Sequence, residues 1–421
     1  MKILIKSALI VDKSSRNHLR KKDIFIRDGV VASIGNDLKA EGKVIESESL
    51  RVSPGWFDMR SNFNDPGFEY KEDIFSGCQA AAAGGFTGVA ILPNTKPVIQ
   101  SKNEISYVLG KAREGIVDLF PYGSVTHDNL GEELTEMIDQ FQAGAIAFTD
   151  GEKPLWNTDI LYKTLQYLKK INGLVINRPE DKGLNMLGLM HEGKINASLG
   201  LKGMPVIAEE VMIERDIRIL EYAGGKLHLS NISTADAVRL VRQGKRKGLN
   251  LTCDIAAYQL AFDDSSLMEF DTNLKVNPPL REKNDIRALQ AGLLDGTIDA
   301  IVSSHTPQDI EAKRQEFDLA EYGMLGLQTV YPILNEALGE KSDELIVDLL
   351  SANPRKILSL PQPEIREGAP ANLTIYDNQA EWVFNEKSNR SKSANSPFWN
   401  KKLTGNVIGV INKGLAFFNP A

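Results

Sequence analysis

Eight short runs of β-forming residues, separated by helical patterns, constrain the fold of this chain most strongly. They lie between residues 55 and 360 of a 421-residue chain. Alternation of strand and helix is typical of a parallel sheet with right-handed crossovers, and eight such units over roughly 300 residues predict a closed (β/α)8 TIM-type barrel, an α/β fold. An open doubly wound sheet is the alternative, but no GxGxxG turn follows a first strand. The predicted strands are 57–62, 89–93, 119–126, 145–149, 173–178, 226–231, 250–255 and 299–304, and the clearest helical patterns are 132–142, 209–223, 234–246 and 286–294.

The two ends of the chain differ from this middle part because both are rich in strand patterns. Asp28-Gly29 separates two apolar runs, as does Asn412-Lys413-Gly414, and both segments predict hairpin turns. We therefore expect one small β-sandwich module built from both chain termini, residues 1–53 plus 362–421, beside a barrel of residues 54–361. The polar stretch 385–395 is predicted to be a surface loop.

Composition excludes several classes of function. The net charge of -7 is spread along the chain and argues against a nucleic-acid or anionic-membrane partner. The basic clusters 20–22 and 245–247 are interpreted as solvated surface. No run approaches the ~18 apolar residues of a membrane span. Cys78 and Cys253 are far apart in sequence, so we expect reduced thiols and a cytoplasmic protein.

Polar residues follow the predicted strands at their carboxyl ends, where barrel proteins place their chemistry. Arg60 and Asn62 project together because residues two apart on a strand face the same way. Arg60 is expected either to pair with Asp58, Asp150 or both, or to form an anion-binding pocket, and the sequence leaves both readings open. The full ring is Asp58, Arg60, Asn62, Asn94, His127, Asp150, Arg178, Asn231, Ser304 and His305.

A divalent metal ion fits this ring poorly. Such ions bind imidazoles, thiolates or carboxylates, whereas a guanidinium has no lone pair to give. The chain has five histidines, and none are spaced as HxH or HExxH. A divalent ion 4 Å from one arginine costs about 8 kcal/mol at an effective dielectric of 20. We therefore expect no bound metal and no cofactor.

Several segments resemble the dihydroorotases and related cyclic amidohydrolases. The run PGWFDMRSNFNDPGFEYKED at 54–73 is similar to the family signature PGxxDxHxHxREPGxExKED. Further matches follow in the family's order, and together they cover essentially the whole chain. The resemblance implies a barrel with a composite β-module, usually zinc, and usually a homodimer. The further matching segments are 92–97, 191–193, 200–205, 233–234, 277–281, 294–299 and 353–357.

The same resemblance places the family's metal ligands on this chain one by one. Five of the six ligand positions carry residues that ligate a metal badly or not at all. Only the bridging carboxylate of the fourth strand, Asp150, is retained. The family's two first-strand histidines fall on Arg60 and Asn62, the fifth-strand histidine on Arg178, the sixth-strand histidine on Asn231, and the eighth-strand aspartate, the usual proton shuttle, on Ser304.

The family's substrate-binding positions are eroded as well. The arginine of the REPG motif falls on Asn64, and the second histidine of the DHAPH motif falls on Gln308. Asn94, Asn277 and His305 are retained as pocket candidates.

These positions predict a dihydroorotase-like protein of pyrimidine biosynthesis that is catalytically inactive. The resemblance implies a structural partnership with aspartate carbamoyltransferase. One alternative is an active dihydroorotase, which converts dihydroorotate to carbamoyl-aspartate, with an atypical site. The other is a metal-independent enzyme or binder of a small anionic ligand, with Arg60 and Arg178 holding the anion and His305 or Asp150 as acid or base.

Overall fold

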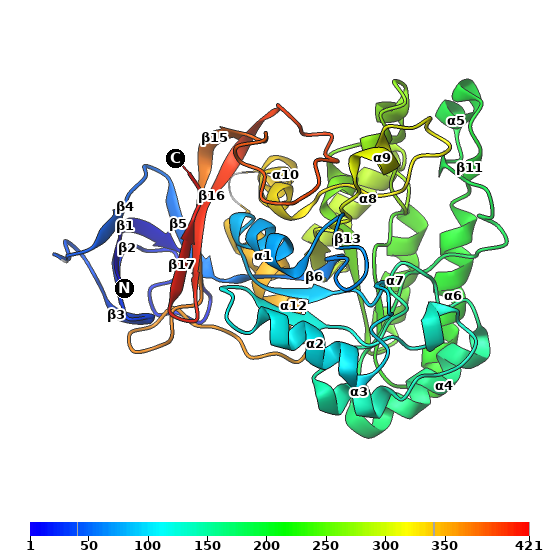
Figure 1. Ribbon diagram of the computed structural model, residues 1–421, viewed down its shortest axis with the longest axis horizontal. Coiled ribbons are helices and arrows are strands. Elements are labelled where there is room, and N and C mark those ends of the chain that lie inside the picture. Colours follow the sequence, from blue (N-terminus) through cyan, green and yellow to red (C-terminus); the bar gives the residue numbers. More distant parts are fainter. Residues whose placement is uncertain (40, 340–341, 421) are drawn as a thin grey trace.

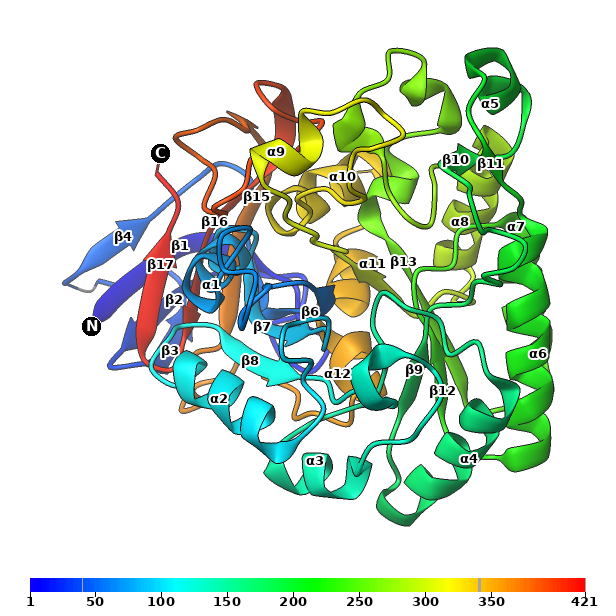
Figure 2. The ribbon, with the colours of Figure 1, turned by 45° about the vertical axis from the view of Figure 1, so that its right-hand side comes forward.

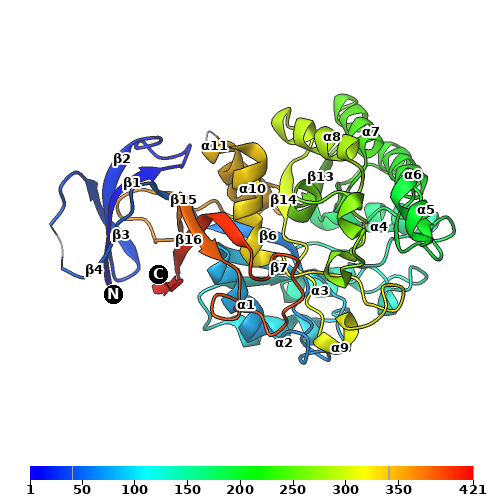
Figure 3. The same ribbon diagram turned by 90° about the horizontal axis from the view of Figure 1, so that it is seen from above.

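The computed structural model describes residues 1–39, 41–339 and 342–420. A β-module and a barrel surrounded by helices lie side by side, and the N-terminal strands of the module run next to the C-terminal ones (Figure 1). Seen from above, the module forms one end of the molecule and the barrel the other (Figure 3). This is the α/β barrel with a terminal β-module that the sequence predicts.

The β-module is one sheet that unites both ends of the chain. Within the described residues its strand order is β17-β16-β15-β5-β1-β2-β3, and β4 pairs with β1. The predicted hairpins form β2–β3 and β16–β17, and Val52 of β5 pairs with Ile375 of β15 to join the two ends. The division of the chain into a β-module of residues 1–53 plus 362–421 and a barrel of residues 54–361 stays a prediction. The strands are β1 Lys2–Ile10, β2 Lys21–Arg27, β3 Val30–Gly35, β4 Lys43–Ile45, β5 Leu50–Pro54, β15 Leu373–Val383, β16 Lys402–Asn412 and β17 Leu415–Phe418.

The barrel consists of two parallel ladders joined by single bridges. One ladder is β6-β7-β8 and the other is β14-β13-β12-β9. Phe148 bridges Gly123 to Val175, and Ser61 bridges to His305, which closes the ring. The predicted strand 145–149 is therefore reduced to a bridge at Phe148. The barrel strands are β6 Trp56–Ser61, β7 Phe86–Ile91, β8 Asp118–Pro121, β9 Val175–Asn177, β12 Leu227–Leu229, β13 Leu251–Ala256 and β14 Ala300–Val302.

Helices cover the outside of the barrel (Figure 2). In α7, Val238 and Val241 are buried three residues apart, and the Thr234 side chain caps the helix by accepting the Ala237 amide hydrogen. The predicted helix 132–142 is wrong at its start, since α3 begins at Met137. Within the described residues, no helix combines the length and apolar character needed to cross a membrane. The outer elements are α1 Ile74–Ala83, α2 Lys102–Ala112, α3 Met137–Ala143, α4 Thr158–Leu168, α5 Lys194–Leu199, α6 Ile207–Ala223, α7 Ala235–Arg246, α8 Lys283–Leu294, α9 Ile310–Lys313, α10 Val330–Leu338, α11 Asp343–Val347, α12 Asn353–Ile357, and a small pair of strands, β10 Met190–His191 and β11 Gly203–Met204.

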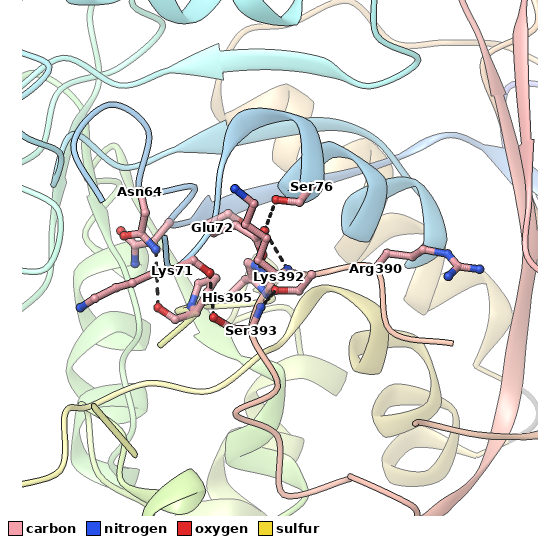
Figure 4. Close-up of polar contacts among 12 residues, drawn as sticks. Asn64, Lys71, Glu72, Ser76, His305, Arg390, Lys392 and Ser393 are labelled. Atoms are coloured by element: carbon pink, nitrogen blue, oxygen red, sulfur yellow. Dashed lines mark hydrogen bonds and ion pairs between the residues drawn. The ribbon is translucent and has the colours of Figure 1, made fainter. Parts of the chain in front are cut away.

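The polar segment 385–396 is a loop, but it is not loosely exposed on the surface as the sequence suggested. Ser393 and Asn395 are only 5% and 4% exposed. The segment runs from the β-module across to the barrel loops that follow β6 and β14 (Figure 4). We call residues 385–396 the strap.

Candidate active site

The barrel mouth is centred on the Glu152 carboxylate rather than on a metal ligand set. Arg60, on β6, is 1% exposed, and its Nη2 donates to Glu152 Oε2 at 3.0 Å. Asn62 Nδ2 donates to Glu152 Oε1 at 2.8 Å. Burial alone would raise the pKa of Glu152, but the guanidinium groups of Arg60 and Arg178 outweigh it and hold that pKa below its usual range. One carboxylate thus engages both side chains at the first-strand ligand positions.

Arg178, at the end of β9, extends this network. Its Nε donates to the Glu152 carbonyl oxygen at 2.9 Å, and its Nη1 forms an ion pair with Glu180. Asn277 Nδ2 donates to Glu180 Oε2 at 3.1 Å. Glu152 and Glu180 were missed as site residues by the sequence analysis. A signal was present, because both are acidic residues two positions beyond a ring residue, on loops that return to the mouth.

Asp150 does not pair with Arg60, so that expectation is wrong. Its carboxylate turns toward the loop after β8 and accepts the amide hydrogens of Val125 and Thr126 at 3.1 and 2.9 Å, together with the Thr126 hydroxyl at 2.5 Å. The Ser124 hydroxyl donates to the same carboxylate at 3.2 Å. The retained carboxylate is therefore already occupied by four local donors.

Asp58 is not the partner of Arg60 either. It accepts from the Ser303 amide and hydroxyl, both at 2.7 Å, and from the Ser61 hydroxyl at 2.5 Å. Burial raises the pKa of Asp58 to about 6 because these donors only partly offset its desolvation. The group lies inside the barrel and links β6 to β14.

The remaining ligand positions form a neutral pair. Asn231 Nδ2 donates to Ser304 Oγ at 2.8 Å, and both residues adopt a positive φ, 58° and 47°. The nearby His228 is buried in the barrel, where its Nε2 lies 2.8 Å from Asp254 Oδ2. His228 thus contacts a barrel carboxylate and does not replace the lost sixth-strand ligand.

The predicted substrate-side residues are engaged within the protein. Gln308 Oε1 accepts from Lys71 Nζ at 2.7 Å and its Nε2 donates to the Tyr322 carbonyl oxygen at 2.8 Å. Asn64 Nδ2 contacts the Pro307 carbonyl oxygen at 3.5 Å. Figure 4 shows Asn64 and Lys71 near Lys392 and Ser393 of the strap.

Asn94 and His305 also support the mouth. Asn94 Oδ1 accepts the Glu152 amide hydrogen at 2.8 Å, which positions the loop that carries this carboxylate. His305 Nδ1 accepts the Gly326 amide hydrogen at 3.2 Å, so its Nε2 carries the proton toward Glu72, 3.4 Å away. Both residues therefore have structural partners.

The residues at the mouth do not fit a zinc ion. Two guanidinium groups, two carboxamides and a hydroxyl stand at five ligand positions, and the sixth, Asp150, is bound to protein donors. Among the described residues, the one cluster of histidine, cysteine or carboxylate groups with ligand atoms within 4.8 Å of one another is His191, Asp264 and Glu282. That cluster contains none of the mouth positions.

Solved structures with the same architecture define the class of protein. L-hydantoinase (dihydropyrimidinase) from Arthrobacter aurescens superposes with a TM-score of 0.84 at 22% identity, over 98% of this chain and 95% of that one. A D-hydantoinase superposes with a TM-score of 0.81 at 24% identity, over 99% and 95%. The fold is therefore the amidohydrolase barrel with a β-module built from the chain termini.

Sequence comparisons narrow this class to a family. A family model described as dihydro-orotase-like matches residues 50–237. A dihydroorotase from Geotalea daltonii is 40% identical over 419 residues, and one from Geobacter sp. (strain M21) is 41% identical over the same length, each covering 98% of both chains. A dihydroorotase from Pelotomaculum thermopropionicum is 39% identical over 96% of both chains. The chain belongs to the dihydroorotase family.

Proposed function

We propose that this chain serves pyrimidine biosynthesis as a dihydroorotase-family protein that holds no zinc at its mouth and does not hydrolyse dihydroorotate. The observation that carries the proposal is the Arg60–Glu152 ion pair, with Asn62 on the second carboxylate oxygen. The pair occupies the place where the family signature has its two first-strand histidines. Arg178 donates to the backbone of Glu152 and extends the network.

Electrostatics supports this proposal. A divalent ion 4 Å from Arg60 is opposed by about 8 kcal/mol at an effective dielectric of 20. Arg178 adds to that repulsion, and the negative charge of Glu152 is already balanced by the positive charges of Arg60 and Arg178. Ser304, at the family's proton-shuttle position, has no carboxylate to move a proton. Loss of several catalytic groups that act together leaves little activity.

The main alternative is an active dihydroorotase with an atypical site, and the names of the relatives favour it. Relatives named dihydroorotase are 40% and 41% identical over nearly the whole chain. By the sequence resemblance, Asp150, Asn94, Asn277 and His305 match the family's residues at their positions. Against it stand the contacts of Asp150, which accepts from Val125 and Thr126 rather than facing an open position.

A second alternative is a binder of a small anion at the mouth. Arg60 Nε and Nη1 are buried and have no hydrogen-bond partner among the described residues. An anion that reached them would satisfy both donors, since a buried unpaired donor is costly. The opposing observation is the proximity of Glu152, which already supplies the negative charge that Arg60 needs.

Metal content and dihydroorotate turnover, measured on one purified sample supplied with zinc, test the proposal. We expect no stoichiometric zinc and no turnover, while the Geotalea daltonii dihydroorotase, assayed in parallel, provides the positive control. Stoichiometric zinc together with turnover would replace the proposal by the first alternative. Calorimetric titration with phosphate or a dicarboxylate tests the second alternative, the binding of a small anion at the mouth.

We further propose a homodimer and an association with aspartate carbamoyltransferase, as the family resemblance implies. Two strongly exposed apolar side chains offer contact points for a protein partner: Phe75, in the first turn of α1, and Met186, on the segment between β9 and β10, are 75% and 76% exposed. Co-purification with the aspartate carbamoyltransferase of the same organism and light scattering of the chain alone test these two statements.

A further inference from the structure

A pocket of about 530 Å³ lies at the opposite end of the barrel from the mouth. It is bounded by the first residues of β6, β7 and β8 and by the segment that leads from α12 back to β15. Its walls combine aromatic and proline side chains with a few polar groups, which is typical of small-molecule sites of this size. The walls include Phe57, Phe120, Pro363, Pro370, Arg355 and Asn372.

Arg355 brings a positive charge into this pocket without a negative partner. The residue is 4% exposed. Its Nη1 donates to the Gly55 carbonyl oxygen at 2.7 Å and to Ser351 Oγ at 2.9 Å, and its Nη2 reaches Thr87 Oγ1 at 3.4 Å. Its Nε donates to no described residue, and no described carboxylate lies within 4.0 Å of the guanidinium. Burial lowers the pKa of Arg355 to about 10, and the negative charge of Asp118 offsets this lowering only in part.

The carboxylates that line the pocket have partners of their own. Asp118 accepts from Asn412 Nδ2 at 3.0 Å and lies 3.5 Å from Lys413 Nζ. Glu364 pairs with Arg366 Nε at 2.9 Å. The uncompensated charge of the pocket is therefore that of Arg355, and it is positive.

We propose that this pocket binds a small organic anion, with a carboxylate at Arg355 and an apolar body against the wall of aromatic and proline side chains. The Arg355 guanidinium lies 5.5 Å from the centre of the Phe57 ring, so the charge and the apolar wall are adjacent. A hydrogen bond from the free Nε of Arg355 to a bound carboxylate would be charge-assisted, and therefore stronger than a hydrogen bond from the same Nε to a neutral acceptor. The pocket lies apart from the mouth, so this proposal does not depend on whether the mouth is catalytic.

Calorimetric titration of the full chain with benzoate and with benzamide tests the proposal, because the two probes share a shape and differ in charge. We expect one benzoate per chain and at least about tenfold weaker binding of benzamide. Arg355→Gln should weaken benzoate binding by about tenfold or more. Arg366→Glu, a charge reversal at the exposed rim, should weaken it several-fold, whereas the exposed Arg20→Glu and the mouth variant Arg178→Gln should leave it unchanged.

Equal affinity for the two probes would overturn the proposal. So would the absence of benzoate binding at ~20 mM, because a specific site of this size should bind with a lower dissociation constant than that. So would benzoate binding that Arg366→Glu leaves intact, or that Arg178→Gln removes. If Arg355→Gln does not fold, Arg366→Glu together with the two probes still decides the outcome, since Arg366 is exposed and its pair with Glu364 is a surface contact.

Discussion

Arg60 Nη2 lies 3.0 Å from Glu152 Oε2, and this ion pair links the end of β6 to the loop after Phe148. The Arg60 side chain is 1% exposed, whereas that of Glu152 is 35% exposed, so the pair joins a buried charge to one that meets solvent. The buried guanidinium depends on this carboxylate, because among the described residues its other hydrogen bond is to the neutral carbonyl oxygen of Gly151, at 3.3 Å.

Removing the carboxylate should destabilise the protein. We expect Glu152→Gln to lower the free energy of unfolding by about 2 kcal/mol, because Arg60 stays buried without its partner while solvent at the half-open side of the pair limits the loss. Urea unfolding measures this. The matched control is Asp159→Asn, which breaks the exposed Asp159–Lys163 pair and should cost less than about 0.5 kcal/mol. Equal effects of the two substitutions would contradict a structural role for Glu152.

Restoring the family's ligand types should restore a metal site. The combined variant Arg60→His, Asn62→His, Arg178→His, Asn231→His and Ser304→Asp is expected to bind about one or two zinc ions per chain, since it replaces cations and amides by imidazoles and a carboxylate. Elemental analysis after dialysis measures the metal. The control keeps the other four changes but carries Arg60→Lys, which retains the repelling charge. Zinc retained equally by the wild-type chain would show that the mouth holds metal by another arrangement.

Asp58 should make stability depend on pH in the acid range. Its folded-state pKa of about 6 lies above the usual 3.8, so the folded protein binds the proton more tightly than the unfolded chain. The resulting stabilisation is present below pH ~4 and is lost as the pH rises through ~6, with an upper limit of about 3 kcal/mol. Unfolding free energies of wild type minus Asp58→Asn should therefore fall between pH 4 and pH 7. The exposed Asp37→Asn should show no such trend, and a flat difference for Asp58→Asn would contradict the assignment.

The strap should depend on Glu72, which is fully buried beneath it. Glu72 accepts the Lys392 amide hydrogen at 3.1 Å and the hydroxyl hydrogens of Ser391 and Ser76, and it faces His305 (Figure 4). We expect Glu72→Ala to speed amide hydrogen exchange across 388–396 and to cost about 2–3 kcal/mol of stability, because several buried donors lose their acceptor.

The control for the strap is Glu386→Ala, an exposed residue of the same segment, which should leave exchange unchanged. Exchange measured by mass spectrometry resolves this segment from the barrel. Protection of 388–396 that survives Glu72→Ala would show that other contacts, such as those of Asn395 with Thr306 and Gly323, hold the strap alone.

Most of the barrel could be predicted because its signal is local. The strand runs are short, most are apolar with several β-branched residues, and helical patterns lie between them, and seven of the eight runs form strands. The exception, 145–149, forms only bridges at Phe148, because ladder formation depends on neighbouring backbones and not on the run itself. The start of α3 was misplaced for a similar reason, since residues before Met137 are held by contacts to the loop after β8, such as Thr135 to Val125.

The architecture and the ring of positions at the mouth follow from local sequence pattern, because strand periodicity decides which side chains point the same way and parallel strands end at one edge. The same pattern places Arg60 and Arg178 where metal ligands are expected. The partners of these side chains, in contrast, are set by the three-dimensional packing: Glu152 pairs with Arg60, Asp150 accepts from Val125 and Thr126, and the strap is bound to Glu72. These pairings depend on the paths by which loops far apart in sequence return to the mouth. Several carboxylates compete there for a few buried donors, and the loop paths, which local sequence pattern does not encode, decide which carboxylate reaches which donor.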